Sequence, residues 1–437
     1  MKRYGDYKPT GAEWIPSIPA SWDIQKIGAL FAQRKEKVSD KDFAPISVTK
    51  NGILPQLATA AKADDGDNRK KVCVGDFVIN SRSDRKGSCG VSDFEGSVSL
   101  INIVLQPRDQ LSGRYAHYLL RNHLFSEEYY RNGRGIVADL WTTRYSEMKT
   151  ILLPVPPREE QDQIVRYLDW QMSKINRLIA AKRKEIDAIH DMEHLYIDHV
   201  FSEIANQKTI RLKYLVEQFV DCPHETPEYC KDGDYCVIRT ADQDYGYLRS
   251  ETLMYRLTES EYTNRIRRAP LNAGDIVYGR EGERWGLACV IPESEKFCLG
   301  QRIMQFVCNK QMVAPEYVMW ALNSSYVRNQ GILDTMGSTS PHVNISTIIN
   351  FRIPYTSREH QHTLVSKIEC TMQKYRQPCE RIENEIQLLH DLRTRLISDV
   401  VTGQIDVRGI KVPDDEYINN EITEEEFEEE SENNEEE

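Results

Sequence analysis

The chain has 437 residues, of which 40% are hydrophobic and 28% charged, a composition typical of a soluble globular protein with two or three domains. No apolar run approaches the roughly 18 residues of a membrane span, and residues 1–22 lack the apolar block of a signal peptide, so we expect a cytoplasmic protein. The net charge is −12, but residues 414–437 hold 14 acidic and no basic residues; the remainder, with 56 basic and 54 acidic residues, gives no general indication of nucleic-acid binding.

Residues 1–157 are predicted to form a mixed α/β domain, the first domain. Short strand-like runs such as Phe77–Ile79 and Val98–Leu105 are separated by Gly, Asn and Asp, which favour turns. Pro154, Pro156 and Pro157 end the segment, and a proline at this point suits the entry to a helix.

Two segments of the first domain, residues 80–87 and 131–144, combine residue types that suit DNA, and we call them the first loop pair. Arginine can bridge O6 and N7 of guanine, arginine and lysine can hold phosphate, and glycine lets the backbone approach closely. Ordinary solvated loops with local ion pairs are the alternative. The candidate DNA-binding residues are Arg82, Arg85, Lys86, Arg131, Arg134, Thr142, Thr143 and Arg144.

Residues 158–203 are predicted to form a long helix, about 60 Å in length at 1.5 Å per residue. Apolar residues recur in it among Lys, Arg, Glu and Asp, as in a solvated coiled coil. The predicted seam consists of Ile164, Leu168, Ile175, Leu178, Ile179, Ile186, Ile189, Met192, Tyr196 and Val200.

The chain then repeats itself with a period near 200 residues. Residues 74–78 (VGDFV) match residues 273–277 (AGDIV), and residues 158–161 (REEQ) match residues 358–361 (REHQ). Because the matches keep their order and spacing, we predict a duplication, with residues 204–357 as a second mixed α/β domain.

The second domain carries counterparts of both candidate DNA-binding segments, residues 279–286 and 338–342, which we call the second loop pair. The two domains differ in sequence, so we expect each to recognise a different DNA sequence, which forms one half-site of the target. The candidate DNA-binding residues here are Arg280, Arg284, Trp285, Ser338, Thr339, Ser340 and His342.

A second long helix is predicted at residues 358–403, followed by an acidic, disordered tail at residues 404–437. Pro378 lies inside this helix, where a proline costs about 3 kcal/mol, so we expect a kink or two shorter helices. The seam repeats in steps of three and four residues: Ile368, Met372, Tyr375, Cys379, Ile382, Ile386, Leu389, Leu396 and Val400.

These elements predict an α+β protein in which two similar mixed domains are joined by two long antiparallel coiled-coil helices with pseudo-two-fold symmetry. Oligomerisation is the alternative use of the seams. A rigid spacer between two similar domains suits a partner with two sites at a fixed separation, and equivalent DNA grooves recur about every 34–36 Å. We therefore predict an asymmetric, bipartite DNA target with an unread gap.

No catalytic or metal-binding motif is found in the sequence. It contains neither the G-x-x-x-x-G-K-[ST] phosphate loop nor a G-x-G-x-x-G after a strand. Cys222, His224, Cys230 and Cys236 match no zinc-site spacing, so we predict free thiols and no metal site. These observations favour a recognition module without catalytic residues or a cofactor of its own.

The sequence resembles the specificity subunit of type I restriction-modification systems over residues 1–407. The resemblance is carried by Trp14-Ile15-Pro16-x-x-Pro19-x-x-Trp22, by the two Gly-Asp-hydrophobic-Val units, and by the proline-rich entry to each helix. It implies two target recognition domains, a helical spacer, two methylation subunits that use S-adenosylmethionine to modify adenine, and restriction subunits that use ATP and magnesium.

Two other interpretations stay open. The chain could be a stand-alone DNA-modifying enzyme, which methyl transfer by the purified chain would support. It could also be a coiled-coil scaffold without DNA specificity, which absent or sequence-independent binding would support.

Overall fold

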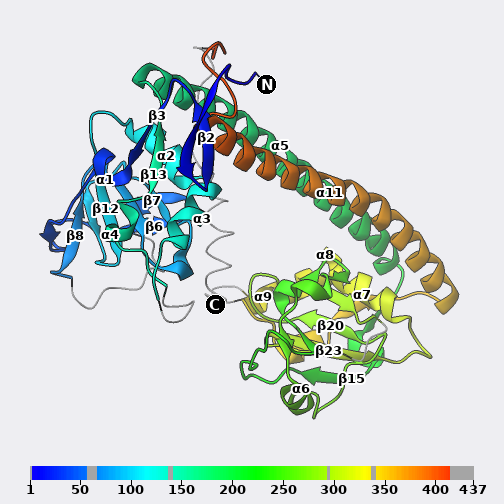
Figure 1. Cartoon of the computed structure of the whole chain (residues 1–437). Coiled ribbons are helices and arrows are strands. Elements are labelled where there is room, and N and C mark those ends of the chain that lie inside the picture. The colour runs from blue at the N-terminus through cyan, green and yellow to red at the C-terminus, as the bar shows by residue number, and fades with distance from the viewer. Residues whose placement is uncertain (1, 57–65, 136–140, 293–295, 336–340, 414–437) are drawn as a thin grey trace. The chain divides into compact units, whose positions relative to one another are not determined.

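The computed structural model describes residues 2–56, 66–135, 141–292, 296–335 and 341–413. The chain divides into two compact units, unit 1 (residues 1–182 and 384–437) and unit 2 (residues 183–383) (Figure 1). Two long helices, α5 (Arg158–Ala205) and α11 (Arg358–Val401), each contribute one part to each unit. No helix within the described ranges combines the length and the apolar character needed to cross a membrane.

Unit 1 is a mixed domain packed on one part of each long helix. Its other helices are α1 (Ile27–Leu30), α2 (Gly113–Arg121), α3 (His123–Arg131) and α4 (Tyr145–Met148). Its strands are β1 (Tyr7–Ala12), β2 (Ile15–Pro19), β3 (Asp23–Lys26), β4 (Phe31–Gln33), β5 (Lys37–Val38), β6 (Ile46–Thr49), β7 (Gly52–Pro55), β8 (Arg69–Val72), β9 (Phe77–Asn80), β10 (Cys89–Val91), β11 (Gly96–Val98), β12 (Asn102–Pro107) and β13 (Leu152–Val155).

Unit 2 is also a mixed domain of strands and short helices, together with the other part of each long helix. Its other helices are α6 (Glu259–Arg265), α7 (Pro315–Asn323), α8 (Ser325–Arg328), α9 (Ile332–Thr335) and α10 (Ile345–Ile348). Its strands are β14 (Thr209–Arg211), β15 (Val216–Asp221), β16 (Tyr235–Ile238), β17 (Gln243–Asp244), β18 (Tyr247–Leu248), β19 (Arg256–Leu257), β20 (Ile276–Gly279), β21 (Ala288–Val290), β22 (Phe297–Leu299), β23 (Ile303–Cys308) and β24 (Arg352–Pro354).

Each unit contains a corresponding antiparallel four-stranded sheet. Its order is β4-β12-β9-β10 in unit 1 and β15-β23-β20-β21 in unit 2. The smaller sheets differ, because β8 pairs antiparallel with β11 whereas β16 pairs parallel with β22. The duplication therefore preserves the central sheet and changes its surroundings.

The repeated Gly-Asp motif forms the same turn before β9 and β20. Gly75 and Gly274 adopt φ values of 87° and 86°, a region that favours glycine. Asp76 and Asp275 are buried, and each carboxylate accepts a hydrogen bond at 2.9 Å, from Cys73 N and Asn272 N respectively. The motif is therefore structural in both units.

The repeated glutamine near the start of each long helix is structural as well. Gln161 Oε1 accepts a hydrogen bond from Ser112 N at 2.8 Å, and Gln361 Oε1 accepts one from Ala314 N at 3.0 Å. Both glutamines are fully buried, so they fix the first turn of α5 and α11 to the segments that precede α2 and α7.

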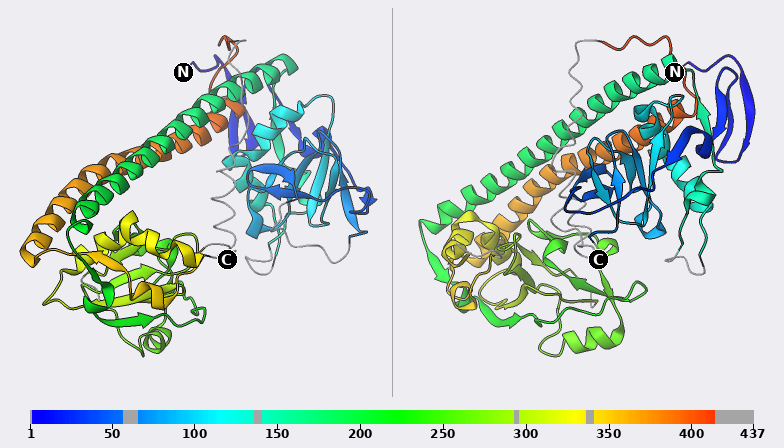
Figure 2. Two further views of the ribbon diagram at one scale, coloured as in Figure 1. Left: turned by 180° about the vertical axis from the view of Figure 1, so that it is seen from behind. Right: turned by 90° about the vertical axis from the view of Figure 1, so that its left-hand side faces the viewer.

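In unit 1, α5 and α11 run antiparallel and share the core (Figures 1 and 2). Buried α5 seam residues pack in one cluster with Leu396 and Val400 of α11, and Lys182 pairs with Glu385 at 2.8 Å. Ile386 and Leu389 are half-buried against this cluster. The buried predicted residues of α5 are Ile164, Leu168, Ile175 and Ile179.

In unit 2, the later part of α5 packs against the first part of α11. Ile368 and Met372 share a core with the α5 residues Ile197, Phe201 and Ile204, which the predicted seam omitted. The remaining predicted residues of α11 that fall in this unit are also at least half-buried: Tyr375, Cys379 and Ile382. Together with the two similar mixed domains, this antiparallel helix pairing confirms the predicted fold class.

Two predicted seam positions of α5 are wrong. Leu178 is 46% exposed and Met192 is 49% exposed. Ile186 and Ile189 are half-buried, but the next inward position belongs to Glu193, which is buried and whose pKa is raised by desolvation. An inward carboxyl breaks the apolar pattern from which the seam was predicted.

Pro378 does not divide the second helix, so of the two expected outcomes, a kink or two shorter helices, the second is wrong. Residues Arg358–Val401 form one continuous helix that contains the proline. A proline lacks the N–H that would donate to the carbonyl four residues earlier, at Lys374, but the hydrogen bonds and packing on either side hold the helix together.

Residues 404–413 were predicted to belong to the disordered tail, and this is wrong. Val407 is fully buried, and Gln163 Nε2 donates to the carbonyls of Val407 and Ile410 at 3.0 and 2.8 Å. Asp406 N donates to Lys2 O at 2.9 Å. Apolar side chains and backbone hydrogen bonds thus hold this segment in unit 1; the rest of the predicted tail, residues 414–437, lies outside the described residues.

Candidate nucleic-acid interface

The two segments of the first loop pair lie side by side. Arg134 and Thr142 exchange backbone hydrogen bonds at 3.0 and 3.1 Å. Ser83 N donates to Trp141 O at 3.0 Å, and Thr143 N donates to Ser81 O at 2.9 Å. Segments about 50 residues apart in the sequence therefore form one surface.

A close backbone approach supports this surface. Trp141 Nε1 donates to Tyr130 O at 2.8 Å, and the indole covers Gly133. A Cβ at Gly133 would lie 2.1 Å from Trp141 Nε1, so no other residue fits without displacing the indole.

The first loop pair presents positive charge to solvent. Arg82, Arg85 and Arg144 are exposed, and within the described residues their guanidinium groups have no ion-pair or hydrogen-bond partner. The Arg134 side chain is 84% exposed and only 4.0 Å from Glu147. These four arginines are available to an anionic partner.

Three other candidates of the first loop pair are already engaged. Thr143 is fully buried and its hydroxyl donates to Tyr129 O at 3.0 Å, so it is a structural residue and not a DNA contact. Lys86 pairs with Glu127 and holds the pKa of that carboxyl below its usual range. Arg131 pairs with Glu13 and Glu128.

Thr142 is half-buried, and its backbone bridges to Arg82 as well as to Arg134. It therefore lies at the centre of the first loop pair and connects its two segments.

The second loop pair is assembled in the same way. Gly282 N donates to Pro341 O at 2.8 Å, and Val343 N donates to Arg280 O at 3.0 Å. His342 is exposed and forms a backbone bridge with Glu281. Ser338, Thr339 and Ser340 lie outside the described residues.

Two candidates of the second loop pair are structural rather than DNA-contacting. Arg280 is 8% exposed and pairs with Glu281 at 2.5 Å and with Asp221 at 3.6 Å. Trp285 is 8% exposed and belongs to the core, with the Arg328 guanidinium 5.0 Å from its ring centroid. The fold draws both side chains inward, which the sequence of the loop does not reveal.

Arg284 is also restrained, since its Nη2 donates to Gln243 O at 2.6 Å and lies 3.8 Å from Asp244. An arginine that sequence reasoning missed takes the exposed position instead. Arg302 precedes β23, and its carbonyl accepts hydrogen bonds from Arg280 N and Glu281 N at 2.9 and 3.3 Å. No periodicity or motif marks this residue in the sequence.

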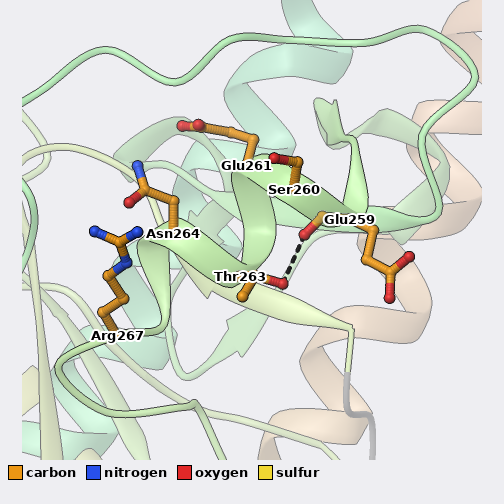
Figure 3. Close-up of a pocket in the computed structure, with 6 residues that line it drawn as sticks. All are labelled: Glu259, Ser260, Glu261, Thr263, Asn264 and Arg267. Atoms are coloured by element: carbon orange, nitrogen blue, oxygen red, sulfur yellow. Dashed lines mark hydrogen bonds between the residues drawn. The ribbon is translucent and has the colours of Figure 1, made fainter.

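The first turns of α6 border a shallow pocket that does not resemble a reaction centre (Figure 3). Thr263 Oγ1 donates to Glu259 O at 2.8 Å, which is a contact within the helix. Glu259 and Glu261 would repel phosphate. The other lining residues are Ser260, Asn264 and Arg267.

Among the residues that the structure describes, no group of three or more His, Cys, Asp or Glu side chains is arranged to hold a metal ion. Cys222 and Cys236 are buried free thiols, and Cys230 is a half-buried one.

Comparison with known proteins places this geometry in a family context. No family model matches the chain. The type I restriction enzyme MjaVIII specificity subunit of Methanocaldococcus jannaschii is 20% identical over 424 residues, which cover 90% of this chain and 95% of that protein. The putative MjaX specificity subunit of the same organism is 18% identical and covers 90% of this chain and 96% of its own length. This chain is a homologue of type I restriction enzyme specificity subunits.

A solved structure agrees with this relationship at the level of the fold. It was described in a study of complex assembly and conformational transition of the type I restriction-modification system. The TM-score is 0.60 at 13% identity, and the match covers 89% of this chain and 99% of that one. The resemblance predicted from the sequence is confirmed.

Proposed function

We propose that this chain is the non-catalytic DNA-specificity subunit of a type I restriction-modification complex, and that it recognises an asymmetric bipartite target. The observation that carries the proposal is the loop pair, which is built once in each unit from corresponding segments beside the corresponding four-stranded sheet. A surface assembled in this way in both domains of a duplicated chain indicates two related binding functions.

The two loop pairs differ in charge, which supports different half-sites. In the first, Arg82, Arg85 and Arg144 are exposed without partners among the described residues. In the second, Arg280 and Arg284 are held by acidic residues or carbonyls. DNA contacts divide into phosphate contacts that position the protein and base contacts that specify sequence. We assign the larger phosphate contribution to the first domain.

The partners and cofactors follow from the homology and remain part of the proposal. Double-stranded DNA is the ligand of the loop pairs, and α5 with α11 sets the gap between half-sites. Two methylation subunits and restriction subunits dock on the chain. S-adenosylmethionine, ATP and magnesium are used by those subunits, while this chain supplies recognition and positioning.

Base-resolution methylation mapping of the source genome tests the proposal. We expect one bipartite motif to be methylated when the gene is present, lost when it is deleted, and restored by a plasmid copy. A second plasmid copy, in which residues 204–357 are replaced by the second domain of another relative, should change one half-site of the methylated motif and keep the other. An unchanged methylation pattern after deletion would contradict the proposal.

A further inference from the structure

Arg302 has a backbone conformation that residues other than glycine rarely adopt. Its φ is 65°, and it is the one non-glycine residue with positive φ in the described part of the chain. This region is unfavourable for a residue with a Cβ, and strained residues of this kind cluster at functional sites. The strain alone assigns no role, but it directs attention to what Arg302 contacts.

The backbone of Arg302 belongs to the second loop pair. Its carbonyl accepts the hydrogen bonds of Arg280 N and Glu281 N, and Glu281 bridges to His342 on the other segment. Its guanidinium lies beside Gly282, with Nη1 3.8 Å from the position that a Cβ would take there. Arg302 is therefore fixed at the base of the surface that the second loop pair presents.

Within the part of the chain that the structure describes, Arg302 is the one of three arginines at this surface whose guanidinium has no protein partner. Arg280 is buried against Asp221 and Glu281, and Arg284 donates to Gln243 O. Arg302 is exposed, and its guanidinium has no ion-pair or hydrogen-bond partner within the described residues. Arg280 and Arg284 are thus engaged by carboxylate or carbonyl groups, whereas the Arg302 side chain is exposed.

The sheet registers identify the residues that take this place in the first domain. Asn102 pairs with Asn80 in unit 1, and Ile303 pairs with Gly279 in unit 2, so Arg302 corresponds to Ile101. Ile101 is 38% exposed and its neighbour Leu100 is 43% exposed. Corresponding positions of the two sheets therefore carry a guanidinium group in the second domain and apolar side chains in the first. Such a difference is expected of a position that discriminates between DNA sequences.

We propose that Arg302 is a specificity-determining residue of the second domain, which donates to O6 and N7 of one guanine in the major groove. This inference rests on the proposed function. The planar guanidinium matches the two guanine acceptors, whereas an apolar side chain favours the methyl group of thymine.

The test uses the complete complex and methylation mapping with three variants. Arg302→Ala removes the fork, Arg302→Lys keeps the charge but not the fork, and Arg302→Gly removes the fork while relieving the positive φ. Each should relax one G·C position of a single half-site, with discrimination there falling roughly 5- to 150-fold, and leave the other half-site unchanged. Lys310→Ala, at the opposite end of β23, removes an exposed charge and should leave the motif intact.

The outcomes separate this inference from the proposed function. A wild-type complex with no bipartite motif contradicts the proposed function. A wild-type motif that all three Arg302 variants retain unchanged overturns the inference alone. If the variants show no relaxed position, and salt-dependent binding titrations of the same complexes show a uniform loss of affinity for all duplexes with lower salt dependence, Arg302 contacts phosphate, which also overturns the inference. Arg302→Gly keeps the test valid if Arg302→Ala lowers the Tm.

Discussion

At the scale of single residues, exposure separates arginines that can contact DNA from arginines that hold the fold. Arg134 and Arg280 illustrate the difference, since one side chain is 84% exposed and the other 10%. Both occur in loops of similar composition, so the distinction comes from the acidic residues that the fold brings to each of them.

Arg134→Ala should weaken DNA binding by the complex without loss of stability. Removing one phosphate contact lowers affinity for all duplexes about equally and reduces the slope of log K against log salt by about 1. Binding titrations at several salt concentrations would measure this. Arg166→Ala, which removes an exposed arginine of α5, is the control. Equal effects of the two substitutions would contradict the assignment.

Arg280→Ala should instead destabilise unit 2. The substitution leaves the carboxylates of Asp221 and Glu281 without their shared partner, at a cost of about 1–3 kcal/mol. We expect a lower midpoint in urea unfolding, and a smaller loss in Arg280→Lys, which keeps the charge. A stable Arg280→Ala protein that no longer binds DNA would show that the side chain contacts DNA directly.

At the scale of elements, the repeated motifs could be predicted from the sequence more readily than the burial of individual side chains. The matching Gly-Asp turns and helix-entry glutamines are local features whose counterparts can be recognised by comparing the two halves. The burial of Trp285, the inward Glu193 and the exposure of Arg302 depend on neighbours brought from distant segments, and the chain carries no local pattern for them.

Pro378→Ala should stabilise α11. Alanine restores the N–H that can donate to the Lys374 carbonyl and removes the clash of the ring with the preceding turn. Proline also restricts the unfolded chain, so the native protein loses less conformational entropy on folding than the alanine variant. This difference offsets part of the gain, and we expect the free energy of unfolding to rise by about 1–3 kcal/mol in chemical denaturation. Leu178→Ala, at the corresponding position of α5 and 46% exposed, should change stability little. A destabilised Pro378→Ala protein would contradict this prediction and indicate that the proline itself stabilises α11.

At the scale of the whole chain, the N-terminal and C-terminal segments are joined within unit 1. Beside the Asp406–Lys2 hydrogen bond, the Tyr7 hydroxyl donates to Gly403 O at 2.9 Å. Arg408 lies over the ring of Tyr4, and the buried Glu160 accepts hydrogen bonds from Tyr4 and from Trp22 Nε1. The N-terminal segment and the C-terminal end of α11 therefore depend on one another.

This arrangement predicts a sharp boundary in truncation experiments. Deleting residues 404–437 removes the buried Val407 and the half-buried apolar residues Ile405, Ile410 and Val412. Since burial of one aliphatic side chain contributes about 1.5–3 kcal/mol, we expect a loss of about 3–5 kcal/mol and faster proteolysis of the first few N-terminal residues. Deleting only residues 414–437 is the matched control, because it removes the 14 acidic residues and leaves residues 404–413 in place. Unfolding curves that coincide for the two truncations would show that residues 404–413 do not stabilise unit 1.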